Sequence, residues 1–413
     1  MRSLEELSRA ELAVVGREYM LFGHLLNRAS LPHVHFQVGA EAREAVAIEE
    51  WMGASPIYTR RMQRLLGFAA DGVGTIFKGF QLDVGFPHQY MDVHYDLESE
   101  ARGYFWLVSC GALLEVEQYG EAAVRSMCHA IEDPTFDASA VATNPRARCR
   151  PIHRPPRSPA DRVPHCRWEV FVDPDAEPIQ EAAITRRVGT SRLAGIAFPA
   201  PPEDATGGRD DYRGAFDPDF RLEHLSRAAL VGVCREFLVQ DHLLIRSLML
   251  SVADRAGDGV AREIATKQWT GAGAVSAARL HRGLAISGDG ADAIAAVLRL
   301  HPAMIPGYGG LGVSASGARS RLWLEDCEAL REGDGYSWSA LLGGDPHPGL
   351  DAMVQAVNPR ARCVPTTPGA DERLAWDIVV EAGVAAAEPP VEVAMVASTN
   401  TARFVFESTE PRS

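Results

Sequence analysis

The 413-residue chain contains an internal duplication, because motifs of its first half return in the same order in its second half. The hexapeptide Asn144-Pro-Arg-Ala-Arg-Cys149 is repeated without change at 358–363. The run Tyr104-Phe-Trp-Leu-Val-Ser-Cys110 returns in altered form at 321–327, and the run that begins at Trp168 returns at 376–380. Such self-similarity indicates two copies of one structural unit.

The first helix of each unit also repeats. Helical spacing of apolar residues predicts a helix from Arg9 to Arg28, with Ser8 as its N-cap. Its copy starts after Ser226, and both the Ser8/Ser226 and the His24/His242 pairs are separated by 218 positions. Because the separation is equal, no insertion interrupts this helix. A histidine kept in both copies favours a hydrogen-bonded core residue.

The order of elements predicts an α+β fold. Further helices are expected over about 40–52, 56–66 and 72–80, followed by a hairpin built from 89–96 and 104–110. A helix is expected over 115–130, an ordered loop or extended segment over 144–164, and a closing strand over 167–172. We therefore expect helices first and then an antiparallel sheet with packed helices.

The domain boundaries follow from the repeat and from composition. The first unit is predicted to span 1–197 and the second, degenerate unit 223–399. The segment 198–222 has the Pro, Gly and Asp content of a linker, and 400–413 is expected to be a loose tail. Two related units could pair as an internal pseudo-dimer, and further homo-oligomerisation stays open.

Composition excludes several classes of protein. The formal net charge of −14 argues against a nucleic-acid partner, which favours a basic surface. No apolar run reaches the roughly 20 residues that span a bilayer, so no membrane partner is expected. The charged N-terminus lacks an apolar signal core, and seven cysteines favour reduced thiols; together these predict a cytoplasmic protein.

The first unit carries a motif that resembles a known family. Cys110, Gly120 and Cys128 are followed by a Pro/Arg-rich segment and then by Cys166-Arg-Trp-Glu-Val170. This order resembles the L-2-amino-thiazoline-4-carboxylic acid hydrolase family and the related vinyl-reductase-type small-molecule-binding domains. The resemblance is clear over about 90–172 and looser over 1–80. It implies an antiparallel sheet, a buried small-molecule pocket and, for the hydrolases, opening of a cyclic amidine by water.

The duplication indicates which copy would carry chemistry. An offset of 214 places Cys128 on Leu342, and an offset of 208 places Cys166 on Leu374, so the second copy lacks these thiols. We therefore place the site in the first unit. The candidate catalytic residues are Cys128, His129, Asp133, His165 and Cys166. A thiolate beside an imidazole is a nucleophile pair, and the Glu132-Asp133 carboxylates could activate water; buried packing residues and an Asp-Pro turn are the structural alternatives.

A basic loop follows these residues and suggests a way to hold a substrate. Guanidinium groups bind carboxylates and phosphates bidentately, so the loop could hold an anionic substrate or simply form surface ion pairs. The candidate substrate-binding residues are Arg148, Arg150, Arg154 and Arg157. The cofactor is unknown. A metal ion is left open although close Cys-x-x-Cys spacing is missing, and its ligands would be Cys110, Cys128, His165 and Cys166.

Two functions are compatible with these features. The first, favoured by the resemblance, is a hydrolase-like enzyme that acts on a small, anionic or cyclic C–N/C–S-containing metabolite in the first unit. The second is a small-molecule-binding or sensor module with an apolar pocket and no turnover. The sequence contains no P-loop, Gly-x-Ser-x-Gly or His-Glu-x-x-His motif, so no complete catalytic signature decides between them.

Overall fold

The computed structural model describes residues 2–201, 207–316, 319–381, 383 and 385–397. The predicted tail, 400–413, lies outside the described residues. Each unit contains one four-stranded antiparallel sheet, and the two sheets have the same strand order, β1-β2-β4-β3 and β5-β6-β8-β7. The strands are β1 Met91–Ser99, β2 Arg102–Cys110, β3 Ala147–His153, β4 Cys166–Val172, β5 Leu311–Ser316, β6 Arg319–Glu325, β7 Ala361–Thr366 and β8 Glu372–Val380. The α+β fold and its duplication are confirmed.

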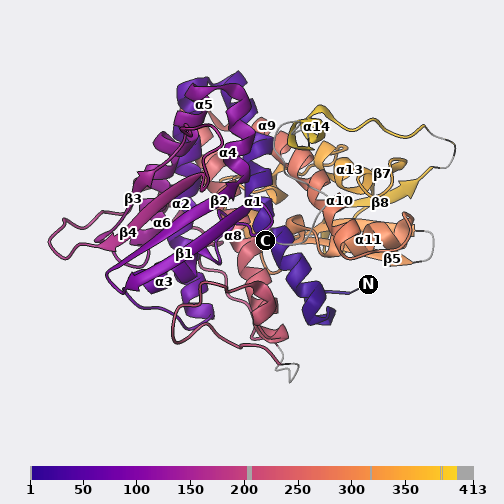
Figure 1. Ribbon diagram of the computed structural model, residues 1–413. Helices are drawn as coiled ribbons and strands as arrows, with labels where there is room; N and C mark the ends of the chain where they lie inside the picture. The colour runs from indigo at the N-terminus through magenta and orange to yellow at the C-terminus, as the bar shows by residue number, and fades with distance from the viewer. Residues whose placement is uncertain (1, 202–206, 317–318, 382, 384, 398–413) are drawn as a thin grey trace.

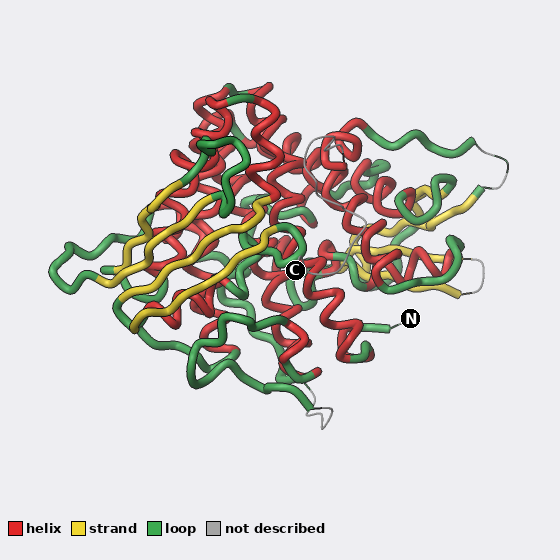
Figure 2. The backbone as a smooth tube through the Cα atoms, in the orientation of Figure 1, coloured by secondary structure: helices red, strands yellow, loops and turns green. Residues whose placement is uncertain are grey.

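Helices of the first unit lie on one face of its sheet, on the left of Figure 2. The first unit also contains two short 3-10 turns and one π-helical turn. In chain order the helices and turns are the 3-10 turn Leu4–Glu6, α1 Arg9–Gln37, α2 Ala40–Leu65, α3 Val73–Phe80, α4 Gly111–Val116, the 3-10 turn Glu117–Tyr119, α5 Glu121–Arg125, the π-helical turn Ser126–Ile131, α6 Glu132–Val141 and α7 Ala183–Gly189.

The second unit repeats this order with small changes. Its counterpart of α2 is divided by a π-helical turn into α9 and α10. The elements are the 3-10 turn Leu222–His224, α8 Arg227–Ala256, α9 Asp258–Gln268, the π-helical turn Trp269–Gly273, α10 Ala274–Gly283, α11 Ala291–Arg299, the 3-10 turn Pro302–Met304, α12 Glu328–Arg331, the 3-10 turn Ser339–Leu341, α13 Pro348–Gln355 and α14 Val391–Ala397.

Two helices run further than the sequence indicates. The first continues from Arg28 to Gln37 through Pro32, and the helices expected over 40–52 and 56–66 form the single helix α2, which contains Pro56. Proline removes one backbone donor and disfavours a helix interior. Pro56 is nevertheless buried in α2, which packs against α8, so tertiary packing offsets the local cost.

The repeated hexapeptides make the same local hydrogen bonds in both units. The Asn144 amide donates to the Asp71 carbonyl oxygen at 2.9 Å, and Asn358 donates to Asp289 in the same way at 3.1 Å. A side-chain carboxylate then accepts the N–H of each closing cysteine. Each hexapeptide thus anchors the start of the strand that begins within it, β3 or β7, in the same way.

The two units meet along α1 and α8, which lie side by side between the two sheets (Figure 1). Arg279 donates to the buried Glu18 carboxylate at 2.9 Å, and Arg61 donates to Glu236 at 2.8 Å. Glu236 and Arg279 are the residues 218 positions after Glu18 and Arg61. Each ion pair is thus the counterpart of the other, which is the contact pattern of an isologous interface.

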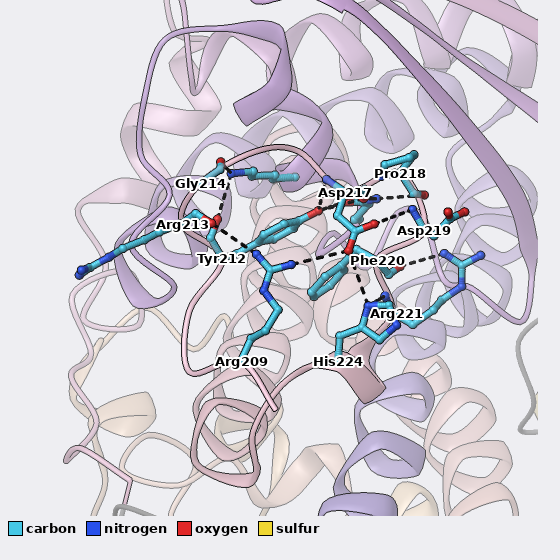
Figure 3. A network of polar contacts seen from close by, with 12 residues as sticks. Arg209, Tyr212, Arg213, Gly214, Asp217, Pro218, Asp219, Phe220, Arg221 and His224 are labelled. Carbon is cyan, nitrogen blue, oxygen red and sulfur yellow. Dashed lines mark hydrogen bonds and ion pairs between the residues drawn. The ribbon is translucent and has the colours of Figure 1, made fainter. Parts of the chain in front are cut away.

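Residues 207–222 of the segment with linker composition pack against the first unit. The Lys78 ammonium donates to the backbone oxygens of Tyr212 and Gly214 at 2.9 and 2.7 Å. The Tyr212 hydroxyl donates to Gln81 at 2.7 Å, within the polar network of Figure 3. Tyr212 and Phe220 stack with ring centroids 4.4 Å apart, so this connection is an ordered strap rather than a free spacer.

One continuous cluster of buried apolar side chains extends through both units. It includes Phe105 and Trp168 on the inner face of the first sheet and Leu322 and Trp376 at the equivalent positions of the second. Among the described residues, no helix is long and apolar enough to cross a membrane.

Candidate ligand cavity

A cavity of about 900 Å³ lies in the first unit, between its helices and the inner face of its sheet. A volume in this range holds a drug-sized ligand. Phe36 and Tyr119 line the cavity although they are 77% and 71% exposed, so they mark its open end. Met395 of α14 also lines it, which means that the second unit contributes to the wall. Apolar side chains on the inner wall include Trp51, Phe86, Tyr90, Met91, Leu107 and Phe136.

His24 contributes an aromatic ring to this wall. Its ring centroid lies 5.8 Å from that of Trp51 and 4.7 Å from that of Tyr90. Its Nε2 lies 3.0 Å from the carbonyl oxygen of Gly85. Burial lowers the pKa of His24 to about 4, so the imidazole is neutral at neutral pH. His24 is therefore hydrogen-bonded as expected for a core histidine, but it also faces the cavity.

An ion pair is built into the same wall. Arg28 donates to the Glu115 carboxylate at 2.8 Å, and the Tyr90 hydroxyl donates to the same oxygen at 3.1 Å. Burial raises the pKa of Glu115, whereas the positive charge of Arg28 acts in the opposite direction. The second unit keeps this arrangement, with Tyr308 donating to Glu332 at 3.4 Å and Arg246 beside it. Because this Arg–Glu–Tyr triad is present in both copies, a structural role explains it best.

Two other carboxyl groups in the wall are specific to the first unit. Asp83 accepts hydrogen bonds from the Tyr58 hydroxyl and the Gly85 N–H, both at 2.7 Å, and burial raises its pKa to about 6. Burial raises the pKa of Glu132 to about 8, although nearby Arg154 opposes this shift. The Glu132 Oε2 atom is buried and has no hydrogen-bond partner among the described residues. Glu132 also lines the cavity, so a rotation of its side chain would present this oxygen to a ligand.

The corresponding space in the second unit is filled by Trp338. Its indole stacks on Trp269, with ring centroids 5.0 Å apart and planes 4° from parallel. The same indole lies 6.1 Å from the ring of His242. Trp269 and His242 are the repeats of Trp51 and His24, both of which line the open cavity. The second unit thus carries its own aromatic plug where the first has space.

The polar residues of the cavity also differ between the copies. With the offset of 218, Asp83 corresponds to His301, and with the offset of 214 Glu132 corresponds to Pro346. The hexapeptide bonds described above support the second offset, because they are reproduced in both units. The first unit therefore combines an open cavity with acidic groups that its copy lacks.

The three thiols of the predicted site gather at this end of the first unit, but only Cys166 lines the cavity. Cys128 and Cys110 are buried, and Cys128 interacts electrostatically with both other thiols and with Glu132. Burial raises the pKa of the Cys128 and Cys166 thiols well above its ordinary value. Both groups are therefore protonated at neutral pH, which disfavours a thiolate nucleophile.

The other predicted catalytic residues are held by the protein itself. His129 contacts the Pro155 carbonyl oxygen at 2.7 Å, and Asp133 pairs with Arg154. The buried His165 accepts the N–H of Cys110 through Nδ1 at 3.1 Å. None of these three side chains lines the cavity.

The arginines proposed to bind substrate are engaged elsewhere. Arg150 pairs with Asp137 and Arg157 with Glu117, with closest approaches of 2.9 and 2.8 Å. Arg148 donates to backbone oxygens, among them that of Ala147 at 2.9 Å. These arginines and Arg154 lie outside the cavity lining. The structure thus ties the basic loop to the body of the first unit.

No metal site is formed by the described residues, which contain no group of three or more His, Cys, Asp or Glu side chains placed to hold an ion. The four thiol and imidazole groups considered as ligands in the sequence accordingly do not form such a group. Within the same residues no disulfide bond is formed, and all seven cysteines are buried.

Comparison of the two copies points to cavity residues that the cysteine motif does not include. Asn27, Tyr58 and Asp83 line the cavity, whereas their counterparts are Ile245, Ser276 and His301. Polar residues that are replaced in the other copy could have been collected across the whole unit instead of only near the cysteines. Comparison with protein-family models, curated proteins and solved structures found no match.

Proposed function

We propose that the first unit binds one small organic molecule with a largely apolar surface, and that the second unit has lost the equivalent site. The observation that carries this proposal is the asymmetry between the copies. Both keep the histidine and tryptophan that frame the space, but Trp338 fills it in the second unit and a cavity of about 900 Å³ occupies it in the first. Close packing is the norm in protein interiors, so a cavity of this size favours a ligand role.

A fluorescent probe tests this proposal. We expect the neutral dye N-phenyl-1-naphthylamine, whose emission rises in apolar surroundings, to bind saturably. Ala47 lines the cavity, so the substitution Ala47→Phe should weaken binding at least tenfold by filling space. Ile48, the next residue of α2, does not line it, and Ile48→Phe serves as the matched control. Equal binding by wild type and Ala47→Phe would contradict the proposal.

Hydrolysis of the bound molecule is a second candidate function, favoured by the carboxyl group of Glu132. A group whose pKa is about 8 exchanges protons readily near neutral pH and can act as a general base or acid. Because the nearby thiols are protonated, a water molecule activated by Glu132 is a better nucleophile than Cys166. Water would add to the amidine carbon of a cyclic substrate, and the ring C–S bond would break to leave a thiol and a carbamoyl group.

Release of that thiol provides the assay. With L-2-amino-thiazoline-4-carboxylate as the probe, we expect the wild-type protein to generate thiol and Glu132→Gln to lose activity at least 100-fold. The exposed Glu121 of α5 gives the control substitution Glu121→Gln, which should keep full activity. If wild type releases no thiol while the fluorescent probe binds, hydrolysis of this substrate class is excluded and ligand binding is retained.

A further inference from the structure

We propose that the ligand of this cavity is an organic amine, with an aromatic ring that stacks on Trp51 and a protonated nitrogen that pairs with Glu132. This inference rests on the ligand binding proposed above and adds the chemical class of the ligand. Its two halves, the ring and the cation, are supported by different observations.

The second unit indicates an aromatic ring, because it shows which group packs against the tryptophan and histidine that both units have. Trp338 lays a planar bicyclic ring on Trp269 and brings it close to His242. Trp51 and His24 present the same two ring types to the open cavity. A flat aromatic group is therefore the shape that these surfaces accommodate, and stacked or edge contacts between aromatic rings add to its burial energy.

The positive charge is indicated by the balance of charged side chains around the cavity. Its lining includes five acidic residues and two arginines. Arg28 is paired with Glu115, and Arg43 donates to the Ser126 hydroxyl at 2.8 Å. The cavity thus has an excess of acidic groups, and its aromatic faces also favour a cation.

Glu132 is the acidic group best placed to receive the cation. Asp83 already accepts two hydrogen bonds from the protein, whereas the buried Oε2 of Glu132 has no partner among the described residues. A buried polar atom without a partner is unfavourable, and a ligand N–H would remove this cost once the Glu132 side chain turns this oxygen toward the cavity. Pro346 stands at the equivalent position of the second unit, where the indole of Trp338 needs no such acceptor.

Binding of a cation should depend on pH through this carboxyl group. Arg154 and Asp133 face Glu132 as charged groups, and the thiols of Cys128 and Cys166 lie close enough to be perturbed by it. Burial raises the pKa of Glu132 to about 8, so the free protein holds it largely protonated at pH 7. Affinity for an amine should therefore rise as the pH increases from 6 to 8.

Three indole derivatives of similar size separate the contributions of ring and charge. Tryptamine carries an ammonium group, 3-ethylindole has none, and indole-3-propionate carries a carboxylate. By isothermal titration calorimetry at pH 8 we expect tryptamine to bind about tenfold or more tightly than 3-ethylindole, and indole-3-propionate to bind most weakly. Glu132→Gln should abolish the advantage of tryptamine and leave 3-ethylindole unchanged, whereas the control Glu121→Gln should change neither.

The outcomes distinguish this inference from the function on which it rests. If 3-ethylindole binds, and Ala47→Phe removes that binding, but tryptamine gains nothing, the cavity is a ligand site and the amine inference is wrong. Tighter binding of indole-3-propionate than of tryptamine would also overturn it. If neither the indoles nor the naphthylamine dye binds, the proposed ligand site itself is refuted.

Discussion

Glu132 brings a carboxyl group to the cavity wall at a cost to folding. Burial raises its pKa from 4.5 to about 8, so the folded protein holds the proton more tightly than the unfolded chain does. The group is protonated in both states below pH 4.5 and lowers stability only above it. The cost grows as the pH rises from 4.5 to 8 and is constant beyond.

Replacing this carboxyl group should therefore stabilise the protein at high pH. We expect Glu132→Gln to raise the free energy of unfolding by up to about 4 kcal/mol at pH 8.5, and to have little effect near pH 4.5. Urea denaturation at pH 4.5, 6.5 and 8.5 measures the difference. A stabilisation that is the same at all three pH values would show that the ionisation of Glu132 is not its cause.

The repeated tryptophans provide a matched pair for packing. Trp269 is fully buried and stacked on Trp338, whereas Trp51 faces the open cavity. Trp269→Ala should cost about 3–5 kcal/mol of unfolding free energy, since it leaves a void in a packed core. The loss of unfolding free energy for Trp51→Ala should be smaller than that for Trp269→Ala by about 2 kcal/mol or more. Chemical denaturation of both variants tests this order, and equal losses would mean that the cavity is closed in solution.

At the scale of elements, local sequence signals correctly predicted those helices and strands whose packing agrees with their local preference. The hairpin, the closing strand and the caps of the first helices were predicted, since period-two patterns and Ser N-caps act locally. The continuity of α2 through Pro56 was not, because it depends on contacts with α8. A buried pocket in the first unit was expected from the resemblance, but most of its lining was not identified, because its walls come from residues as distant in sequence as His24, Cys166 and Met395.

The N-caps of α1 and α8 should contribute similar energies. Ser8 accepts the N–H of Glu11 and Ser226 accepts that of Ala229, at 3.3 and 3.2 Å. Ser8→Ala and Ser226→Ala should each lower the free energy of unfolding by about 1 kcal/mol. Replacement by Asp instead of Ala should restore most of the loss. Denaturation midpoints that do not move with Ala would show that these caps are dispensable.

At the scale of the whole molecule, we expect the two units to unfold as one cooperative body. Their apolar core is continuous, and the reciprocal pairs Glu18–Arg279 and Arg61–Glu236 lie in their interface. The sequence predicted a pseudo-dimer from the repeat alone, but it could not identify these partners, because they are far apart along the chain. The cavity is completed by Met395 of the second unit, so the plugged copy still shapes the proposed site.

Breaking one interface pair should destabilise both units together. Arg279→Leu leaves the Glu18 carboxylate buried without its partner and should cost about 3–5 kcal/mol. The double variant Glu18→Leu/Arg279→Leu should recover most of this loss, because no charge remains buried. We expect a single unfolding transition in calorimetry for wild type and both variants. Two separate transitions would contradict the cooperative interface.

The most direct test of an open first unit and a plugged second unit is the number of indole molecules that the protein binds. Isothermal titration calorimetry should give one site per chain for wild type and two for Trp338→Gly, since removal of the plug opens the equivalent space. The Ala47→Phe variant should lose the site in the first unit and therefore bind no indole derivative. An unchanged stoichiometry in Trp338→Gly, or no binding to wild type, would contradict the central claim.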